Sequence, residues 1–239
     1  MKIFIKMLVA AGLLALAASP AIAYEPGTFV FRAGVGTIQP KSSNLDFIFQ
    51  DEIFGDVEAC VDIANGTGMT LGGTYMINQN WAFDVLAALP IEHDINAELT
   101  IIDPGLLEVP VDYNARAKIG ETKQIPPTFS FQYHFAPDRD FQPYFGLGLN
   151  WTTFSSTKLH PDMVDDEVSK LILDDSFGVA AQLGGDWQIG DRTVLSLDVR
   201  WMDIDSDIYV GGPGIEGKEK IGTAEIDPWM YALNLGYRF

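Results

Sequence analysis

The sequence predicts an all-β protein, an eight-stranded antiparallel transmembrane β-barrel with short periplasmic turns and long extracellular loops. Three observations carry this prediction. Eight segments alternate in side-chain character with a period of two residues, and the connections between them alternate strictly between short and long. The last segment, Trp229–Phe239, has aromatic residues at both ends of an apolar face. A spanning strand needs only about 9–11 residues, which is the scale of these segments.

The eight segments are rich in aromatic and β-branched residues, as strands are. They are Phe29–Ile38, Thr70–Ile77, Trp81–Leu89, Thr128–Phe135, Tyr144–Phe154, Ser176–Ile189, Thr193–Ile204 and Trp229–Phe239. Three connections are short and rich in turn residues: Asn78-Gln79-Asn80, Ala136–Pro143 and Gly190-Asp191-Arg192. Stretches of roughly twenty to forty residues join the other pairs, as expected of loops at one end of a barrel. Because the short turns of such barrels are periplasmic, both ends of the barrel are expected on the periplasmic side.

Residues 1–23 are expected to be a cleavable secretory signal peptide, and residues 24–239 to form the outer-membrane barrel. Lys2 and Lys6 supply a positive start, Met7–Ala18 is an apolar stretch, and Ala21-Ile22-Ala23 is a small-x-small cleavage site. The predicted location is therefore the outer membrane of a Gram-negative bacterium.

The chain is strongly acidic, with 15 basic and 33 acidic residues and a net charge of −18. This charge argues against nucleic acid as a partner, because phosphates would be repelled. Much of the acidic excess falls in predicted loops, around Asp165 and Asp205. Either these loops are simply solvated, or they bridge through divalent cations to an anionic glycolipid surface such as lipopolysaccharide. The single cysteine, Cys60, allows no internal disulfide.

The last segment indicates which face meets membrane lipid. Its apolar face consists of Trp229, Tyr231, Leu233, Leu235, Tyr237 and Phe239. Aromatic residues at both tips with leucines between them are typical of a lipid-facing surface flanked by interfacial girdles. A soluble barrel would instead place its large apolar residues inside, so the pattern favours a membrane barrel. The aromatic C-terminal residue, Phe239, also resembles the signal that the outer-membrane assembly machinery reads.

The opposite, inward-facing positions near the periplasmic end are polar or charged. The predicted polar plug consists of Arg32, Asp84, Asp186, Asp198, Arg200 and Arg238, with Gln132 and His134 beside them. Three arginines and three aspartates inside a narrow barrel should pair, because an unpaired buried charge costs several kcal/mol. An eight-stranded barrel is only just wide enough for its side chains to fill it, so the plug should close the lower half and serve stability.

Nearer the outer end, the inward positions become apolar or small. The predicted ligand channel is lined by Ile38, Leu86, Ala88, Pro90, Phe154 and Met202, with Gly36, Gly148, Gly178 and Ala180 leaving space. The loops above add Phe47, Ile48, Phe49, Ile53, Phe54, Leu106, Leu107, Met163, Val164 and Ile172. These loop residues form either a water-shielded pocket or ordinary packing between loops.

An apolar funnel above a charged plug sets a route for a small hydrophobic molecule. Such a molecule cannot continue downward through ion pairs, so its cheapest exit is sideways into the membrane. Pro90 is a candidate for the exit, because it cannot donate a ladder hydrogen bond and is tolerated where strand pairing is broken. Alternatively, Pro90 merely ends its strand.

Along the whole mature chain the sequence resembles the OmpW family of outer-membrane proteins, of the AlkL and OprG kind. The stretches that carry the resemblance are Arg32-Ala33-Gly34 with Pro40, Thr74-Tyr75-Met76 with Asn80-Trp81, Ala87–His93, Pro126-Pro127-Thr128 with Gln132–Phe135, Pro143–Gly148, Leu173–Gly178, Asp227-Pro228-Trp229 and Tyr237-Arg238-Phe239. The resemblance implies uptake of small hydrophobic molecules through a tunnel with a lateral opening near Pro90. The loops Asn44–Met69 and Asn96–Ala115 depart from it.

The leading hypothesis is passive uptake of small hydrophobic ligands, with no cofactor. The alternative is a structural or receptor barrel, serving adhesion, phage or colicin binding, or envelope stability, without transport. An enzyme is not expected, because His93, His134 and His160 show no nucleophile–base–orienter spacing with any serine. No residues have the spacing of metal ligands.

Overall fold

The structure, a computed structural model, describes residues 24–41, 45–51, 55–103, 113–164 and 168–239. The predicted signal peptide lies outside these ranges. The barrel strands are β1 (Phe29–Gln39), β4 (Gly66–Met76), β5 (Trp81–Ala88), β8 (Thr128–His134), β9 (Phe141–Leu159), β11 (Ser176–Gln188), β12 (Thr193–Met202) and β15 (Trp229–Arg238). Each predicted segment corresponds to one of these strands, so the predicted fold class is confirmed.

The eight strands close on themselves in the order β11-β12-β15-β1-β4-β5-β8-β9, with β9 pairing back to β11. Every pair is antiparallel, and the register of the closing pair runs from Ser176↔Thr152 to Trp187↔Phe141. Closure leaves no unpaired edge in the ring, which is the condition for a sheet to cross a membrane. None of the helices in the described ranges is long and apolar enough to span a membrane.

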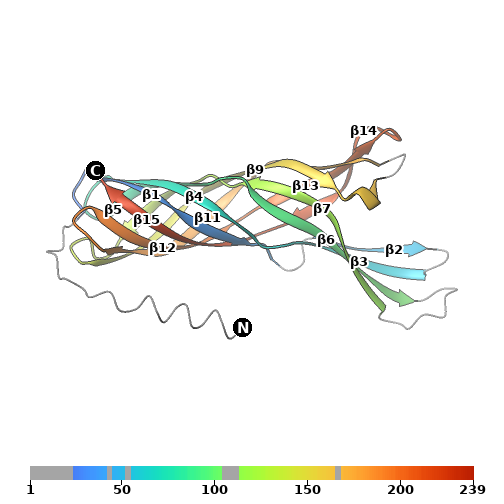
Figure 1. Cartoon of the computed structure of the whole chain (residues 1–239), viewed down its shortest axis with the longest axis horizontal. Coiled ribbons are helices and arrows are strands. Elements are labelled where there is room, and N and C mark those ends of the chain that lie inside the picture. The colour runs from blue at the N-terminus through green and yellow to red at the C-terminus, as the bar shows by residue number, and fades with distance from the viewer. Residues whose placement is uncertain (1–23, 42–44, 52–54, 104–112, 165–167) are drawn as a thin grey trace.

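The long loops contain further strands, which the sequence did not predict. A sheet in the order β9-β7-β6-β3-β2 continues the wall outward through β7 (Tyr113–Ile125), β6 (Ile91–Asp103), β3 (Gly55–Ile63) and β2 (Leu45–Asp51). A second sheet consists of β10 (Lys170–Leu173), β13 (Asp205–Gly212) and β14 (Ile215–Glu225), and a 3-10 helix covers Pro161–Met163. Figure 1 shows these elements reaching beyond the barrel at the end opposite the C-terminus.

The short connections lie at the other end of the barrel. The turn after β4 closes where the amide nitrogen of Ile77 donates to the carbonyl of Trp81 at 2.8 Å, and the turn after β11 where Ile189 donates to Thr193 at 3.0 Å. The predicted turn Ala136–Pro143 is shorter than expected, because β9 begins at Phe141 and Pro143 already pairs with Gly185.

The predicted lipid face is confirmed in β15, where exposed and buried residues alternate along the whole strand. Leu233 and Leu235 at its centre are each 55 % exposed, whereas Ala232 and Asn234 beside them are buried. The other predicted outward residues of β9 and β11 that are exposed are Phe145, Leu147, Leu149, Trp151, Phe177, Val179, Leu183 and Trp187. The outside of the barrel is therefore apolar, and its polar side chains are inside.

An arginine in the middle of this lipid face should destabilise the inserted barrel. We expect Leu233→Arg to cost about 2–4 kcal/mol, because the guanidinium would meet hydrocarbon near the bilayer midplane. Reversible urea unfolding in phosphatidylcholine vesicles measures this loss. The control is Ile221→Arg, since Ile221 is 52 % exposed on β14 in the outer sheet. Equal losses for the two variants would contradict the assignment of the lipid face.

Candidate functional site

A buried ionic network crosses the interior of the barrel. Arg32, on β1, lies with one terminal nitrogen 2.6 Å from Asp186 and the other 3.6 Å from Asp84. Arg32 also donates hydrogen bonds to Thr74 and, at 3.0 Å, to Ser196. The arginine is 4 % exposed, so its charge depends on these partners and not on water.

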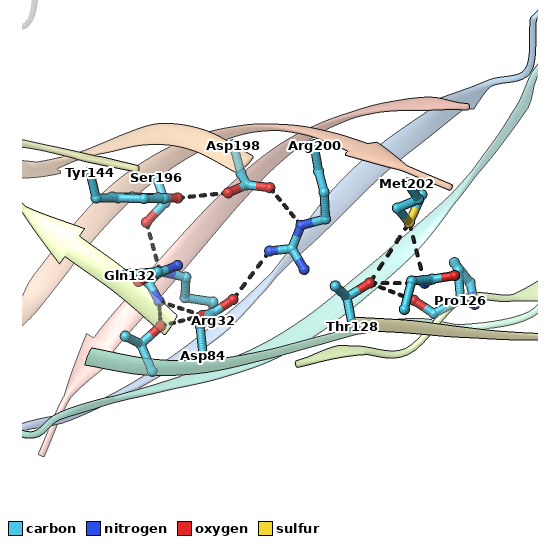
Figure 2. Close-up of polar contacts among 12 residues, drawn as sticks. Arg32, Asp84, Pro126, Thr128, Gln132, Tyr144, Ser196, Asp198, Arg200 and Met202 are labelled. Carbon is cyan, nitrogen blue, oxygen red and sulfur yellow. Dashed lines mark hydrogen bonds and ion pairs between the residues drawn. The ribbon is translucent and has the colours of Figure 1, made fainter. Parts of the chain in front are cut away.

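A second arginine continues the network toward the outer end. Arg200, on β12, is 1 % exposed; its Nη2 lies 3.1 Å from Asp84 and its Nε 3.3 Å from Asp198. Asp84 therefore bridges the two arginines, as Figure 2 shows. Because the network joins β1, β5, β11 and β12, it fixes strands from opposite sides of the barrel to one another.

Hydroxyl groups complete the coordination of the carboxylates. Tyr24 and Ser196 donate to Asp186 at 2.6 and 2.5 Å, Thr74 donates to Asp84 at 2.5 Å, and Tyr144 donates to Asp198 at 3.0 Å. From here on, the polar plug means these four residues together with five of the six predicted ones, Arg32, Asp84, Asp186, Asp198 and Arg200. The sequence prediction missed the hydroxyl residues, although Thr74 and Ser196 occupy inward positions of predicted strands. Tyr24 precedes the first strand, where no alternation marks it.

The sixth predicted plug residue, Arg238, lies at the periplasmic end. It donates a hydrogen bond to Gln188 at 3.3 Å, and its guanidinium carbon is 4.9 Å from the centre of the Tyr24 ring. Gln132 and His134 are also buried as predicted, with 3.2 Å between His134 Nε2 and Gln132 Oε1. Together these contacts close the barrel beneath the network.

Above the polar plug, the interior contains a large apolar cluster. Of the predicted channel residues, Ile38 and Met202 are 0 % exposed, and Leu86 and Ala88 are 4 and 5 % exposed. They belong to one cluster, which we call the apolar chamber: Ile38, Ile63, Leu86, Ala88, Ile91, Ile95, Leu171, Leu173, Ala180, Met202, Ile204, Ile208, Ala224, Ile226, Met230 and Ala232. Phe154 is partly buried against it. Because Ile38 and Met202 are 0 % exposed, side chains pack closely around them.

The loop residues fit the predictions less well. Met163 and Val164 are 43 and 45 % exposed, so these two residues fit neither prediction, a water-shielded pocket or close packing between loops. The residues that do enter the chamber from this loop are Leu171 and Leu173, because β10 alternates and leaves Ile172 half-buried between them. The side chains of Phe47, Ile48, Phe49, Ile53, Phe54, Leu106 and Leu107 lie outside the described part of the chain.

The barrel wall is interrupted beside the chamber. The pairs between β5 and β8 end at Leu86↔Thr128, and pairing resumes between β6 and β7 at Ile91↔Gln124. Residues 87–90 and 125–127 lie between these two points, and they include Pro90, Pro126 and Pro127. None of the three prolines has an N–H to donate, which accounts for the break in the ladder.

The strands on either side of this seam remain joined to their other neighbours. Leu89 donates to the carbonyl of Met69 at 2.9 Å, and Trp151 donates to the carbonyl of Pro127 at 3.0 Å. Pro90 itself is exposed, so its predicted place among inward channel residues is wrong. Pro90 lies between β5 and β6, at the break in the wall, and the alternation of inward and outward side chains along a strand does not extend to it.

The three histidines each lie against a local partner. His93 Nδ1 is 2.8 Å from the carbonyl of Ala64, His134 contacts Gln132, and His160 Nδ1 is 3.4 Å from Asp162. None of these partners is a serine or cysteine, so the contacts do not form a nucleophile–base pair.

The chain is similar to known outer-membrane proteins. The model of the OmpW family matches residues 25–239. Outer membrane protein W of Vibrio cholerae is 33 % identical over 230 residues, covering 95 % of both chains. Outer membrane protein AlkL of Ectopseudomonas oleovorans is 26 % identical over 207 residues, covering 83 % of this chain and 80 % of AlkL.

Solved structures show the same fold. The crystal structure of the outer membrane protein OprG from Pseudomonas aeruginosa superposes with a TM-score of 0.73 at 31 % identity, covering 91 % of this chain and 98 % of OprG. The solid-state NMR structure of AlkL in lipid bilayers gives a TM-score of 0.63 at 20 % identity, covering 95 and 97 % of the two chains.

Removing one arginine from the polar plug should be costly. We expect Arg200→Met to lower the free energy of unfolding by about 3–5 kcal/mol, because Asp198 and Asp84 would lose a guanidinium partner in a buried site. Urea unfolding in lipid vesicles measures this loss, and adding Asp198→Asn should recover part of it.

The matched control is Lys218→Met, which removes an exposed ion pair of 3.0 Å to Asp174. Exposed pairs contribute little, so the control should unfold almost as the parent does. If Arg200→Met also behaved like the parent, the polar plug would not stabilise the barrel.

Proposed function

The chain belongs to the OmpW family and is a β-barrel protein of the outer membrane; on that premise we propose that it takes up small hydrophobic molecules passively. In this proposal a molecule enters the apolar chamber from the extracellular end and leaves sideways into the membrane near Pro90. The exposed apolar outside of the barrel contacts membrane lipids, so the exit leads directly into hydrocarbon.

One observation carries the proposal: the break in the wall lies at the level of the apolar chamber. Leu86 and Ala88, which border the break on β5, are buried chamber residues, while Pro90 at its upper end is exposed. An apolar molecule in the chamber would therefore lie beside a stretch of wall that no ladder hydrogen bonds hold together. Little polar backbone pairing has to be broken for it to pass.

The polar plug makes the alternative route unfavourable. A hydrocarbon moving downward would have to separate Arg200 from Asp198 and Asp84 without offering either charge a new partner. Separating buried charges costs several kcal/mol, whereas transfer of apolar surface into the membrane core is favourable. The difference between the two routes directs the molecule to the side.

The chamber is packed, so passage requires side chains to move apart. Met202 and Met230 are suited to this movement, because an unbranched thioether side chain has three rotatable bonds and adapts to irregular spaces. Neighbouring Ala88, Ala180 and Ala232 have small side chains that leave such movements room. We therefore expect a channel that opens transiently around its ligand.

A bulky residue on the chamber side of the break should block uptake. We expect Ala88→Phe to reduce uptake of radiolabelled naphthalene by cells to that of cells lacking the protein, because the ring would fill the chamber beside the exit. Ala181→Phe is the control: Ala181 is half-buried on the outward face of β11, a strand that does not border the break. It should leave uptake unchanged.

A second pair of variants tests the break itself. Pro90→Ala restores a backbone N–H at the seam and should slow uptake, whereas Pro213→Ala, in the exposed turn between β13 and β14, should not. The proposal fails if cells with the parent protein take up naphthalene no faster than cells without it.

We also propose that the aromatic end of β15 is read during assembly. Phe239 is 73 % exposed and lies 5.0 Å, ring centre to ring centre, from Tyr237 on the outward face. The inward neighbour Arg238 belongs to the closed periplasmic end instead. Deleting Phe239 should lower the amount of folded barrel in the outer membrane, measured by heat-modifiable electrophoresis. Arg238→Ala should insert normally, and equal defects would contradict this division of the strand.

A further inference from the structure

Two polar side chains are buried in the apolar surroundings just above the break in the wall. His93, on β6, and Gln124, on β7, are each 1 % exposed. The Nε2 atom of each has no hydrogen-bond partner among the described residues. They share one face: Gln124 pairs with Ile91 and His93 with Thr122, so the two side chains are diagonal neighbours on the ladder.

The hydrogen bond of His93 Nδ1 determines whether Nε2 can donate or accept a hydrogen bond. Nδ1 lies 2.8 Å from the carbonyl oxygen of Ala64, and a carbonyl can only accept, so Nδ1 carries the hydrogen and donates it. Burial lowers the pKa of His93 below its usual value, so the ring is neutral at pH 7. Nε2 therefore presents a lone pair, a hydrogen-bond acceptor, to the interior.

Gln124 offers the complementary group. Its side-chain Nε2 carries two hydrogens and can only donate. Ile91 and Ile95, which belong to the apolar chamber, flank His93 on the inward face of β6. The packing around His93 is close, because a methyl group added at Gly66 would come within 2.7 Å of its Cε1 atom. An acceptor and a donor thus lie on one face of the β6–β7 pair, next to residues of the apolar chamber.

We propose that His93 and Gln124 form a recognition site for the hydroxyl group of an otherwise apolar molecule, such as an alkylphenol or a long-chain alcohol. The hydroxyl hydrogen is donated to His93 Nε2, and its oxygen accepts from Gln124 Nε2. The apolar remainder of the molecule occupies the apolar chamber. The inference rests on the proposed uptake function and names the ligand class that the chamber prefers.

Pure hydrocarbons fit this site less well. A hydrocarbon leaves both polar atoms buried and unpaired, whereas a hydroxyl pairs both at once. A site built to hydrogen-bond a hydroxyl discriminates strongly against the analogue that lacks it, because the protein's own polar atoms are then left unsatisfied. The other buried atoms without partners, such as Arg200 Nη1 and the side-chain amide of Gln182, lie lower, in and beside the polar plug.

The test compares 4-propylphenol with propylbenzene, which differ by one hydroxyl. The ¹⁵N-labelled full chain in lipid nanodiscs is titrated with each compound, and the His93 ring nitrogens are followed by long-range ¹H–¹⁵N NMR. We expect 4-propylphenol to move the Nε2 resonance and to bind roughly tenfold more tightly than propylbenzene, a factor ordinary for a net gain in hydrogen bonding. His93→Phe and Gln124→Leu should each reduce this preference to near one.

The control is His160→Phe, which changes a histidine of the outer loops that is not buried and should leave the preference intact. If His93→Phe misfolds, Gln124→Leu and the Nε2 resonance of the parent still decide the matter. An Nε2 resonance that 4-propylphenol does not move, as when water alone satisfies the site, would overturn the inference, as would equal binding of the two compounds. Failure of the uptake function is seen separately, as neither compound entering cells faster with the protein than without it.

Discussion

The charges buried inside the barrel constrain everything else in this structure. Eight strands enclose a space that side chains fill, so the carboxylates and guanidiniums pointing inward cannot be hydrated and must satisfy one another. The polar plug meets this requirement through Asp84, which joins Arg32 to Arg200, and through the hydroxyl groups that surround the network. Once these groups are paired, the lower half of the barrel is closed.

The apolar chamber begins directly above the polar plug. The boundary between them is sharp: Arg200, in the network, and Met202, in the apolar chamber, are successive inward residues of the same strand. Thr128 donates a hydrogen bond to the sulfur of Met202 at 3.7 Å (Figure 2), and Asn150 Nδ2 lies 3.4 Å from the same sulfur, so polar side chains reach the lower edge of the apolar chamber. Immediately beyond Thr128, the prolines interrupt the wall. An apolar space with a closed floor and an interrupted side favours lateral exit.

Much of this arrangement follows from the sequence, because a membrane barrel imposes a two-residue period with opposite demands on its two faces. That period places Leu233 outside and Asn234 inside without knowledge of the register between strands. It also places Arg32, Asp84 and Arg200 inside, and charge neutrality then predicts that they pair. Pro90 is different, because at a break in the wall the alternation ends and burial no longer follows from position.

Other features depend on pairings between distant segments that periodicity does not specify. Tyr24 joins the polar plug from outside any strand, and its bond to Asp186 spans 162 residues of sequence. The outer strands β6 and β7 pair across a long loop, and only their register brings His93 and Gln124 onto one face. The exposure of Met163 and Val164 likewise reflects a local turn that composition does not reveal.

The most direct test of lateral exit is to map where a hydrophobic molecule travels inside the barrel. A small aryl-diazirine hydrocarbon is added from the extracellular side to the protein in oriented vesicles, photolysed, and its attachment sites are located by mass spectrometry. We expect labelled interior residues in the apolar chamber, such as Met202 and Met230, and on both sides of the break. Interior label below the polar plug, at His134 or Arg238, would show that the molecule passes down through the barrel and would contradict lateral exit.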